Sequence, residues 1–117
     1  MYSDLDLNEE NKNIINNFSN NLKNLDKHIS KKKFKAIFIT QVKFDGISDI
    51  NLYLVNEYLK KFCTEKNYPI IKLDELTKDF SEGDFYDEYH TTIKGSTKIS
   101  NLIYSQLKEI LIKNFTN

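Results

Sequence analysis

The sequence contains no arginine: all 17 basic residues are lysines, and 17 acidic residues balance them. Arginine supplies the paired donors that are favoured for recognising phosphate and guanine. A formal net charge of zero also produces no long-range field that would attract nucleic acid or an anionic membrane. The composition therefore argues against nucleic acid as a partner.

Cysteine is limited to Cys63, which excludes an intramolecular disulfide and favours a small buried side chain over a nucleophile. Long apolar runs are missing too, since none approaches the ~18 residues that a membrane span needs. The residues after Met1 lack the basic and apolar regions of a signal peptide. We expect a soluble chain without a membrane span, cytoplasmic as written, and the compartment of any longer protein stays unknown.

The 117 residues are enough for one small domain, and hydrophobic spacing indicates its elements. Apolar residues that recur every three or four positions predict amphipathic helices, and short runs rich in β-branched residues predict strands. The helices are expected at 8–30, 49–66 and 93–115, the strands at 34–42 and 69–73, a helical turn at 74–80, and loops at 43–48 and 81–89. Strands that alternate with helices predict a parallel sheet with crossover connections.

Only two strands are predicted, which is too few for three amphipathic helices. A two-stranded sheet leaves apolar edges unpaired and cannot cover three helical faces. The pattern therefore indicates the second half of a larger sheet, or a module that pairs with another chain. We expect a complementing chain or a homo-oligomer to cover the open sheet edge.

The segment from Gly83 to Gly95 carries the residues that suit chemistry, directly before the last helix. Asp87 stands three positions before His90, where its carboxylate can bind one ring nitrogen, fix the tautomer and stabilise the imidazolium. Thr92 can cap the helix that follows. Gly95 lowers helix propensity, which predicts a close approach of the helix start to a strand or a substrate.

This block resembles the final sequence block of the SGNH hydrolases, the GDSL-type esterases and lipases, whose chains end with Asp-x-x-His, a Thr, a Gly and a last helix. The Ile-Phe-Ile-Thr-Gln and Pro-Ile-Ile-Lys-Leu-Asp segments also resemble the two strands before that block. The resemblance implies an α/β fold, a flavodoxin-like three-layer α/β/α sandwich with a parallel sheet. It also implies hydrolysis of an ester by a serine nucleophile, with His90 as general base and Asp87 orienting it, and with no cofactor or metal.

The family's Gly-Asp-Ser block and its oxyanion-hole segments have no counterpart in the sequence. Residues 1–117 are therefore interpreted as a single partial domain, the C-terminal half of such a sandwich. We expect this chain to carry the Asp–His part of the triad and to be inactive alone. The alternative hypothesis is a non-enzymatic oligomeric or binding module that retains the half-fold.

Other interpretations of the acidic loop are less favoured. A metal site formed by Asp84, Asp87, Glu88 and His90 would crowd its ligands within seven positions. Asp84 and Glu88 fit solvated loop residues better.

Three further residues are candidates with simpler explanations. Tyr86 and Tyr89 could line an acyl pocket, although aromatic packing is the more favoured explanation. His28, near the end of the first helix, suits the negative pole of the helix dipole better than catalysis. None of the serines stands in the strand–turn–helix context of a nucleophile elbow.

Overall fold

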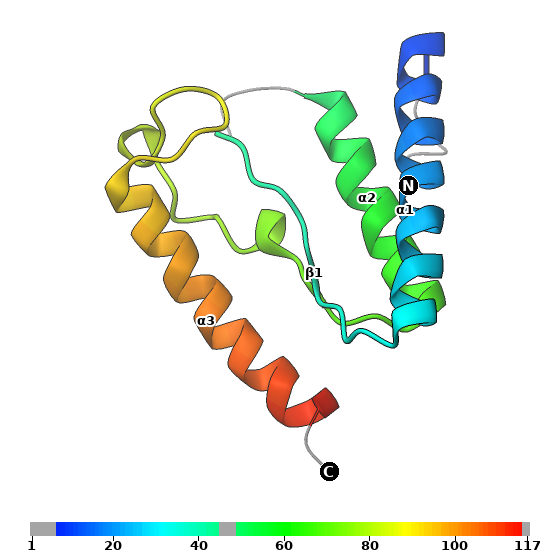
Figure 1. The fold of residues 1–117 in the computed structure, drawn as a ribbon. Coiled ribbons are helices and arrows are strands. Elements are labelled where there is room, and N and C mark those ends of the chain that lie inside the picture. Colours follow the sequence, from blue (N-terminus) through cyan, green and yellow to red (C-terminus); the bar gives the residue numbers. More distant parts are fainter. Residues whose placement is uncertain (1–6, 45–48, 116–117) are drawn as a thin grey trace. The chain divides into compact units, whose positions relative to one another are not determined.

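The computed structural model describes residues 7–44 and 49–115. Its elements follow the order α1, β1, α2, β2, α3, with two short 3₁₀ turns, η2 and η3, before α3 (Figure 1). The described chain forms two compact units, each assembled from two separate segments. Residues 7–37 and 49–68 build the first unit, and residues 38–44 and 69–115 build the second.

Helix α1 (Glu9–Lys32) begins and ends with local capping. The Asn8 side chain accepts a hydrogen bond from the backbone N–H of Asn11, and the Asn11 side chain accepts one from Asn8 in return. This capping box satisfies two N–H groups that have no helical partner. At the other end Lys33 adopts a left-handed conformation with φ of 55°, which ends the helix.

Helix α2 (Ile50–Lys66) also has a local cap at each end, with a single side-chain bond at its start. The Asp49 carboxylate accepts a hydrogen bond from Leu52 N at 3.0 Å. Asn67 is left-handed with φ of 61°, and Tyr68 N donates to Cys63 O at 2.9 Å. Both helix ends were thus predicted by the sequence to within two residues, because periodic apolar positions and capping residues are local signals.

The two helices of the first unit pack in parallel. Three side-chain hydrogen bonds join their segments in ascending order: Asn11 with Asn51, Ser19 with Tyr58, and Asp26 with Tyr68. The core beside them is apolar and consists of Leu22, Ile29, Leu54, Leu59, Phe62 and Cys63. Because the polar pairs recur every seven to ten residues along both segments, slipping one helix by a turn would leave buried polar groups unpaired.

The second unit contains a minimal parallel sheet. β1 (Phe38–Ile39) pairs with β2 (Ile70–Ile71) in the register Phe38 to Ile70 and Ile39 to Ile71. η2 (Leu73–Glu75), η3 (Glu82–Asp84) and α3 (Ile93–Phe115) follow. Helix α3 packs against β2, η2 and η3. The parallel pairing that the sequence predicted is confirmed.

The predicted three-layer α/β/α sandwich, or half of one, is wrong for this chain. The described residues are mostly helical, with three α-helices of 24, 17 and 23 residues and two paired strands of two residues each. The run 34–42 is apolar enough for a longer strand, but only two of its residues form the ladder with β2. Each residue of a strand needs a paired residue on a neighbouring strand. Here β2 is the neighbouring strand, and it pairs only with Phe38 and Ile39.

Helix α3 buries little of its apolar stripe. Ile93 is 82% exposed and Tyr104 is 68% exposed. Among the residues of α3 whose burial is described, only Gly95 is buried. The other apolar residues of the stripe are half-buried at Ile99, Leu102, Ile103, Leu107 and Ile110, and exposed at Leu111. Two short strands and two turns therefore do not cover a helix of this length.

Among the residues that the structure describes, no helix is long and apolar enough to cross a membrane.

Candidate functional site

The predicted dyad lies at the tip of a narrow hairpin in the second unit. Phe85 and Thr91 form an antiparallel bridge, and Tyr86 N donates to His90 O at 2.7 Å. Residues 87–89 therefore turn the chain through a tight loop. This turn places the carboxylate of Asp87 and the imidazole of His90 on the same side.

Asp87 and His90 are in direct contact, as the sequence predicted. His90 Nδ1 lies 2.8 Å from Asp87 Oδ2 and 3.0 Å from Oδ1. A carboxylate at Nδ1 favours the tautomer that carries its proton there and leaves Nε2 as the acceptor. The His90 side chain is 78% exposed, and no described residue bonds to its Nε2. The arrangement is that of an oriented base facing solvent.

Asp87 is held by backbone as well as by the ring. Its Oδ1 accepts hydrogen bonds from Tyr89 N at 2.9 Å and from His90 N at 2.8 Å. These bonds, together with the His90 ring, lower the pKa of Asp87 to about 2. The carboxylate is therefore charged throughout the neutral range, which is the state that can stabilise an imidazolium.

Thr92 and Gly95 attach this hairpin to helix α3. Thr92 Oγ1 accepts a hydrogen bond from Gly95 N at 3.2 Å, which confirms Thr92 as the N-cap. The same hydroxyl donates to Gly83 O at 2.9 Å, and Thr92 N donates to Asp84 O at 2.9 Å. A Cβ at Gly95 would lie 2.1 Å from Asp84 O. The predicted close approach at Gly95 is confirmed, with the Asp84 backbone as the neighbour rather than a strand or substrate.

Asp84 is fully buried, so its interpretation as a solvated loop residue was wrong. Its Oδ2 accepts hydrogen bonds from Lys98 Nζ at 2.7 Å and from Ser81 N at 2.8 Å. Lys98 and the Ser81 N–H lower the pKa of Asp84. Its Oδ1 is buried without a hydrogen-bond partner. The Asp84–Lys98 ion pair joins η3 to α3, the two elements that flank the hairpin in the chain.

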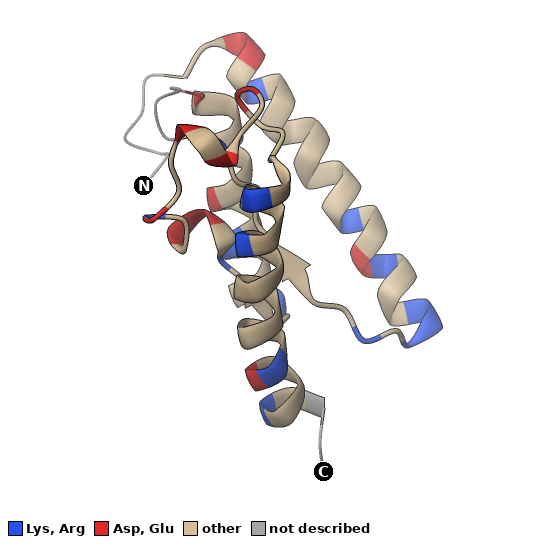
Figure 2. Cartoon of the chain, turned by 90° about the vertical axis from the view of Figure 1, so that its left-hand side faces the viewer, with Lys and Arg blue, Asp and Glu red and all other residues tan. Residues whose placement is uncertain are grey.

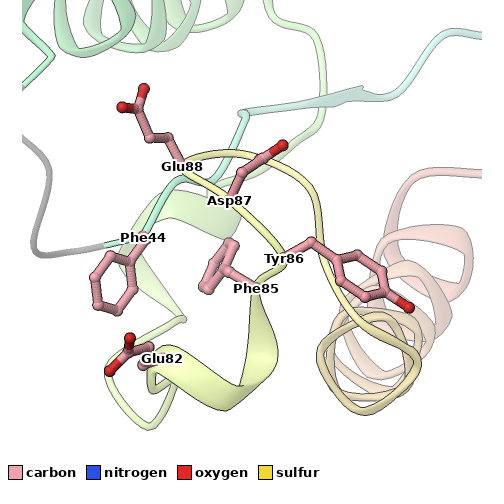
Figure 3. A pocket seen from close by; sticks show the side chains of 6 residues that line it. All are labelled: Phe44, Glu82, Phe85, Tyr86, Asp87 and Glu88. Carbon is pink, nitrogen blue, oxygen red and sulfur yellow. The ribbon is translucent and has the colours of Figure 1, made fainter.

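A pocket of about 240 Å³ opens beside Asp87. Figure 3 shows the rings of Phe44 and Phe85 side by side in it, with centroids 5.8 Å apart, while the Tyr86 ring points away from Phe44. The lining consists of Phe44, Glu82, Phe85, Tyr86, Asp87 and Glu88. Tyr86 thus borders the pocket and Tyr89 does not. Nothing in the sequence marks Phe44 as part of this pocket. Only the tertiary structure brings it next to Phe85, which lies 41 positions further along the chain.

The other candidate residues, His28 and the serines, lie outside this hairpin. His28 belongs to α1 in the first unit, where its ring centroid is 6.5 Å from that of Phe34. In the described residues no serine hydroxyl bonds to His90, and Ser96 pairs with Thr91 Oγ1 at 2.7 Å. No group of three His, Cys, Asp or Glu side chains within the described part of the chain is placed to hold a metal ion.

Comparisons of the chain with protein-family models, with curated proteins and with solved structures found no match.

Proposed function

We propose that Asp87 and His90 are the acid and the base of a serine ester hydrolase whose nucleophile comes from a polypeptide segment outside these 117 residues. The observation that carries the proposal is the pair itself. The Asp87 carboxylate binds His90 Nδ1 at 2.8 Å, and the opposite ring nitrogen faces solvent. The resemblance of the Asp-x-x-His, Thr and Gly block to SGNH hydrolases supports the same chemistry.

Each residue has one task in this mechanism. His90 Nε2 takes the proton from the attacking serine hydroxyl and later returns it to the leaving alkoxide. Asp87 keeps the ring in the correct tautomer and stabilises the imidazolium without being protonated. The lowered pKa of Asp87 suits that task, because the carboxylate keeps its charge throughout the neutral range.

The pocket next to Asp87 suits the apolar part of an ester. Its Phe44 and Phe85 rings offer an apolar wall, and the acidic residues Glu82, Asp87 and Glu88 also line it. A negatively charged acyl group would be repelled there. The proposed substrate is therefore a neutral or cationic ester of limited size.

The missing segment must supply the serine and the donors of an oxyanion hole. Residual rates in triad enzymes come from those donors and from substrate binding. We therefore expect the isolated chain to hydrolyse no ester at a measurable rate.

The decisive experiment isolates the chain from its own cells with whatever it is bound to, and measures ester hydrolysis and labelling by a fluorophosphonate. We expect turnover, and a label on a serine outside these 117 residues. His90→Ala should abolish turnover, Asp87→Asn should lower it by up to about 10⁴-fold, and the control His28→Ala should leave it unchanged. Wild-type kcat in His90→Ala would contradict the proposal.

A second candidate function is a non-enzymatic oligomeric or binding module. It is favoured by helix α3, whose Ile93, Tyr104 and Ile112 side chains are exposed. Exposed apolar surface of this kind often marks an interaction site. Sedimentation equilibrium distinguishes the two: a self-associating chain that never acquires a reactive serine supports the module, and a monomer without partners excludes it.

A further inference from the structure

The net charge of zero conceals a strongly uneven distribution along the chain. Residues 27–35 contain five lysines and one histidine without any acidic residue, so they carry a charge of at least +5. The other residues therefore carry −5, and the stretch 74–88 holds seven acidic residues against Lys78. Figure 2 shows lysines gathered at the C-terminal end of α1. The average composition thus hides a local basic surface, here called the basic tip and defined as residues 27–35.

The basic tip includes an exposed aromatic ring between two of its lysines in the sequence. Phe34 is 59% exposed and follows the left-handed Lys33, with its N–H bonded to Ile29 O at 3.1 Å. This closure fixes the ring just beyond the helix end, next to His28. All five lysines of the tip are exposed, and Lys31, Lys32 and Lys33 form no ion pair with a described carboxylate.

We infer that the basic tip docks the chain onto an anionic lipid surface, with the lysines at the headgroups and Phe34 in the interfacial layer. Clusters of four to eight basic residues attract acidic lipids, and a central aromatic ring adds apolar contact. This function is independent of the proposed esterase site, which lies in the other unit.

Nucleic acid is the less favoured occupant. The chain has no arginine, so the tip lacks planar donor pairs for phosphate or guanine. Lysine suffices for a diffuse layer of lipid phosphates, where charge matters more than geometry. Single-stranded nucleic acid needs several stacking rings along a groove, whereas the tip presents Phe34 at one point.

The first test compares binding to vesicles of phosphatidylcholine and phosphatidylglycerol in equal parts with binding to phosphatidylcholine alone. We expect binding only to the anionic vesicles, and its loss when salt is raised. Each lysine at the surface contributes about fivefold in affinity, so Lys31→Gln, Lys32→Gln and Lys33→Gln together should weaken binding roughly 100-fold.

The matched control changes three exposed lysines elsewhere, Lys78, Lys108 and Lys113, to glutamine. Both triple variants have the same net charge of −3, so only the position of the lysines differs. The control should bind anionic vesicles within a few-fold of wild type. Equal loss in both variants would show a response to net charge and overturn the inference.

The second test uses the absence of tryptophan from the chain. In Phe34→Trp, the new side chain is the single indole, and its emission should shift to the blue on anionic vesicles. Tyr104→Trp places an indole at a 68% exposed position of α3 and should not shift. An unshifted Trp at position 34, or tighter binding to single-stranded RNA than to vesicles at equal salt, would overturn the inference.

Discussion

Replacing Gly95 by alanine tests how the hairpin is attached to helix α3. In an open helix the change should stabilise by about 1 kcal/mol, because alanine has the higher helix propensity. Here the added Cβ would lie 2.1 Å from Asp84 O and 2.9 Å from Asp84 C. Those atoms belong to the backbone and cannot rotate away, so η3 and the start of α3 must separate.

The separation breaks two hydrogen bonds, Thr92 N to Asp84 O and Thr92 Oγ1 to Gly83 O, both 2.9 Å long. Each neutral bond contributes about 1 kcal/mol, and overpacking of this kind costs about 1 to 3 kcal/mol. After the gain in propensity is subtracted, we expect Gly95→Ala to destabilise the chain by about 2 to 4 kcal/mol.

Urea denaturation followed by far-ultraviolet circular dichroism measures this difference. The matched control is Gly83→Ala, where no atom lies within 4 Å of the new Cβ and φ is not positive. The control should be neutral, or more stable by up to about 1 kcal/mol. If Gly95→Ala is as stable as wild type, the steric reasoning and the packing of η3 on α3 are both wrong.

Three further predictions concern local groups. Burial raises the pKa of the Cys63 thiol to about 11. A disulfide reagent should therefore react with Cys63 slowly in the folded protein at neutral pH and quickly in urea. A fast reaction of the folded protein would contradict the burial of Cys63. Lys33→Gly removes the steric cost of a left-handed lysine and should stabilise by about 1 kcal/mol, seen as a higher urea midpoint; an unchanged midpoint would refute it. The folded-state pKa of Asp87 is about 2, below its ordinary value of 3.8. Its bonds to the Tyr89 and His90 amides should therefore be complete above about pH 4 and lost as pH falls through about 2. Amide shifts that move with a midpoint near 4 would show that the bonds are absent.

The three helices could be predicted from the sequence because their signals are local. The expected bounds 8–30, 49–66 and 93–115 lie within two residues of the observed ones. The length of the strands could not be predicted. The apolar run 34–42 suggested nine residues of strand, but pairing depends on a distant segment, and only Phe38 and Ile39 form the ladder.

The same distinction applies to the site. Asp87 and His90 are three residues apart, so a single turn suffices to bring them together, and the spacing predicted it. Asp84 and Lys98 are 14 residues apart, and nothing local marks them as a buried pair. The pocket wall at Phe44 depends on a bond to Glu88 O across the fold, which no spacing rule predicts.

The parallel packing of α1 and α2 has a consequence for synthesis and for modular evolution. The Asp26–Tyr68 bond closes only when residue 68 has been made, and by then residues 38–44 of the other unit have already been translated. During synthesis, neither unit can therefore be completed before part of the other unit has been translated. β1 stays without its partner strand until β2 has been made. A recombination breakpoint between residues 38 and 68 would divide both units, so neither can be inherited as a cassette.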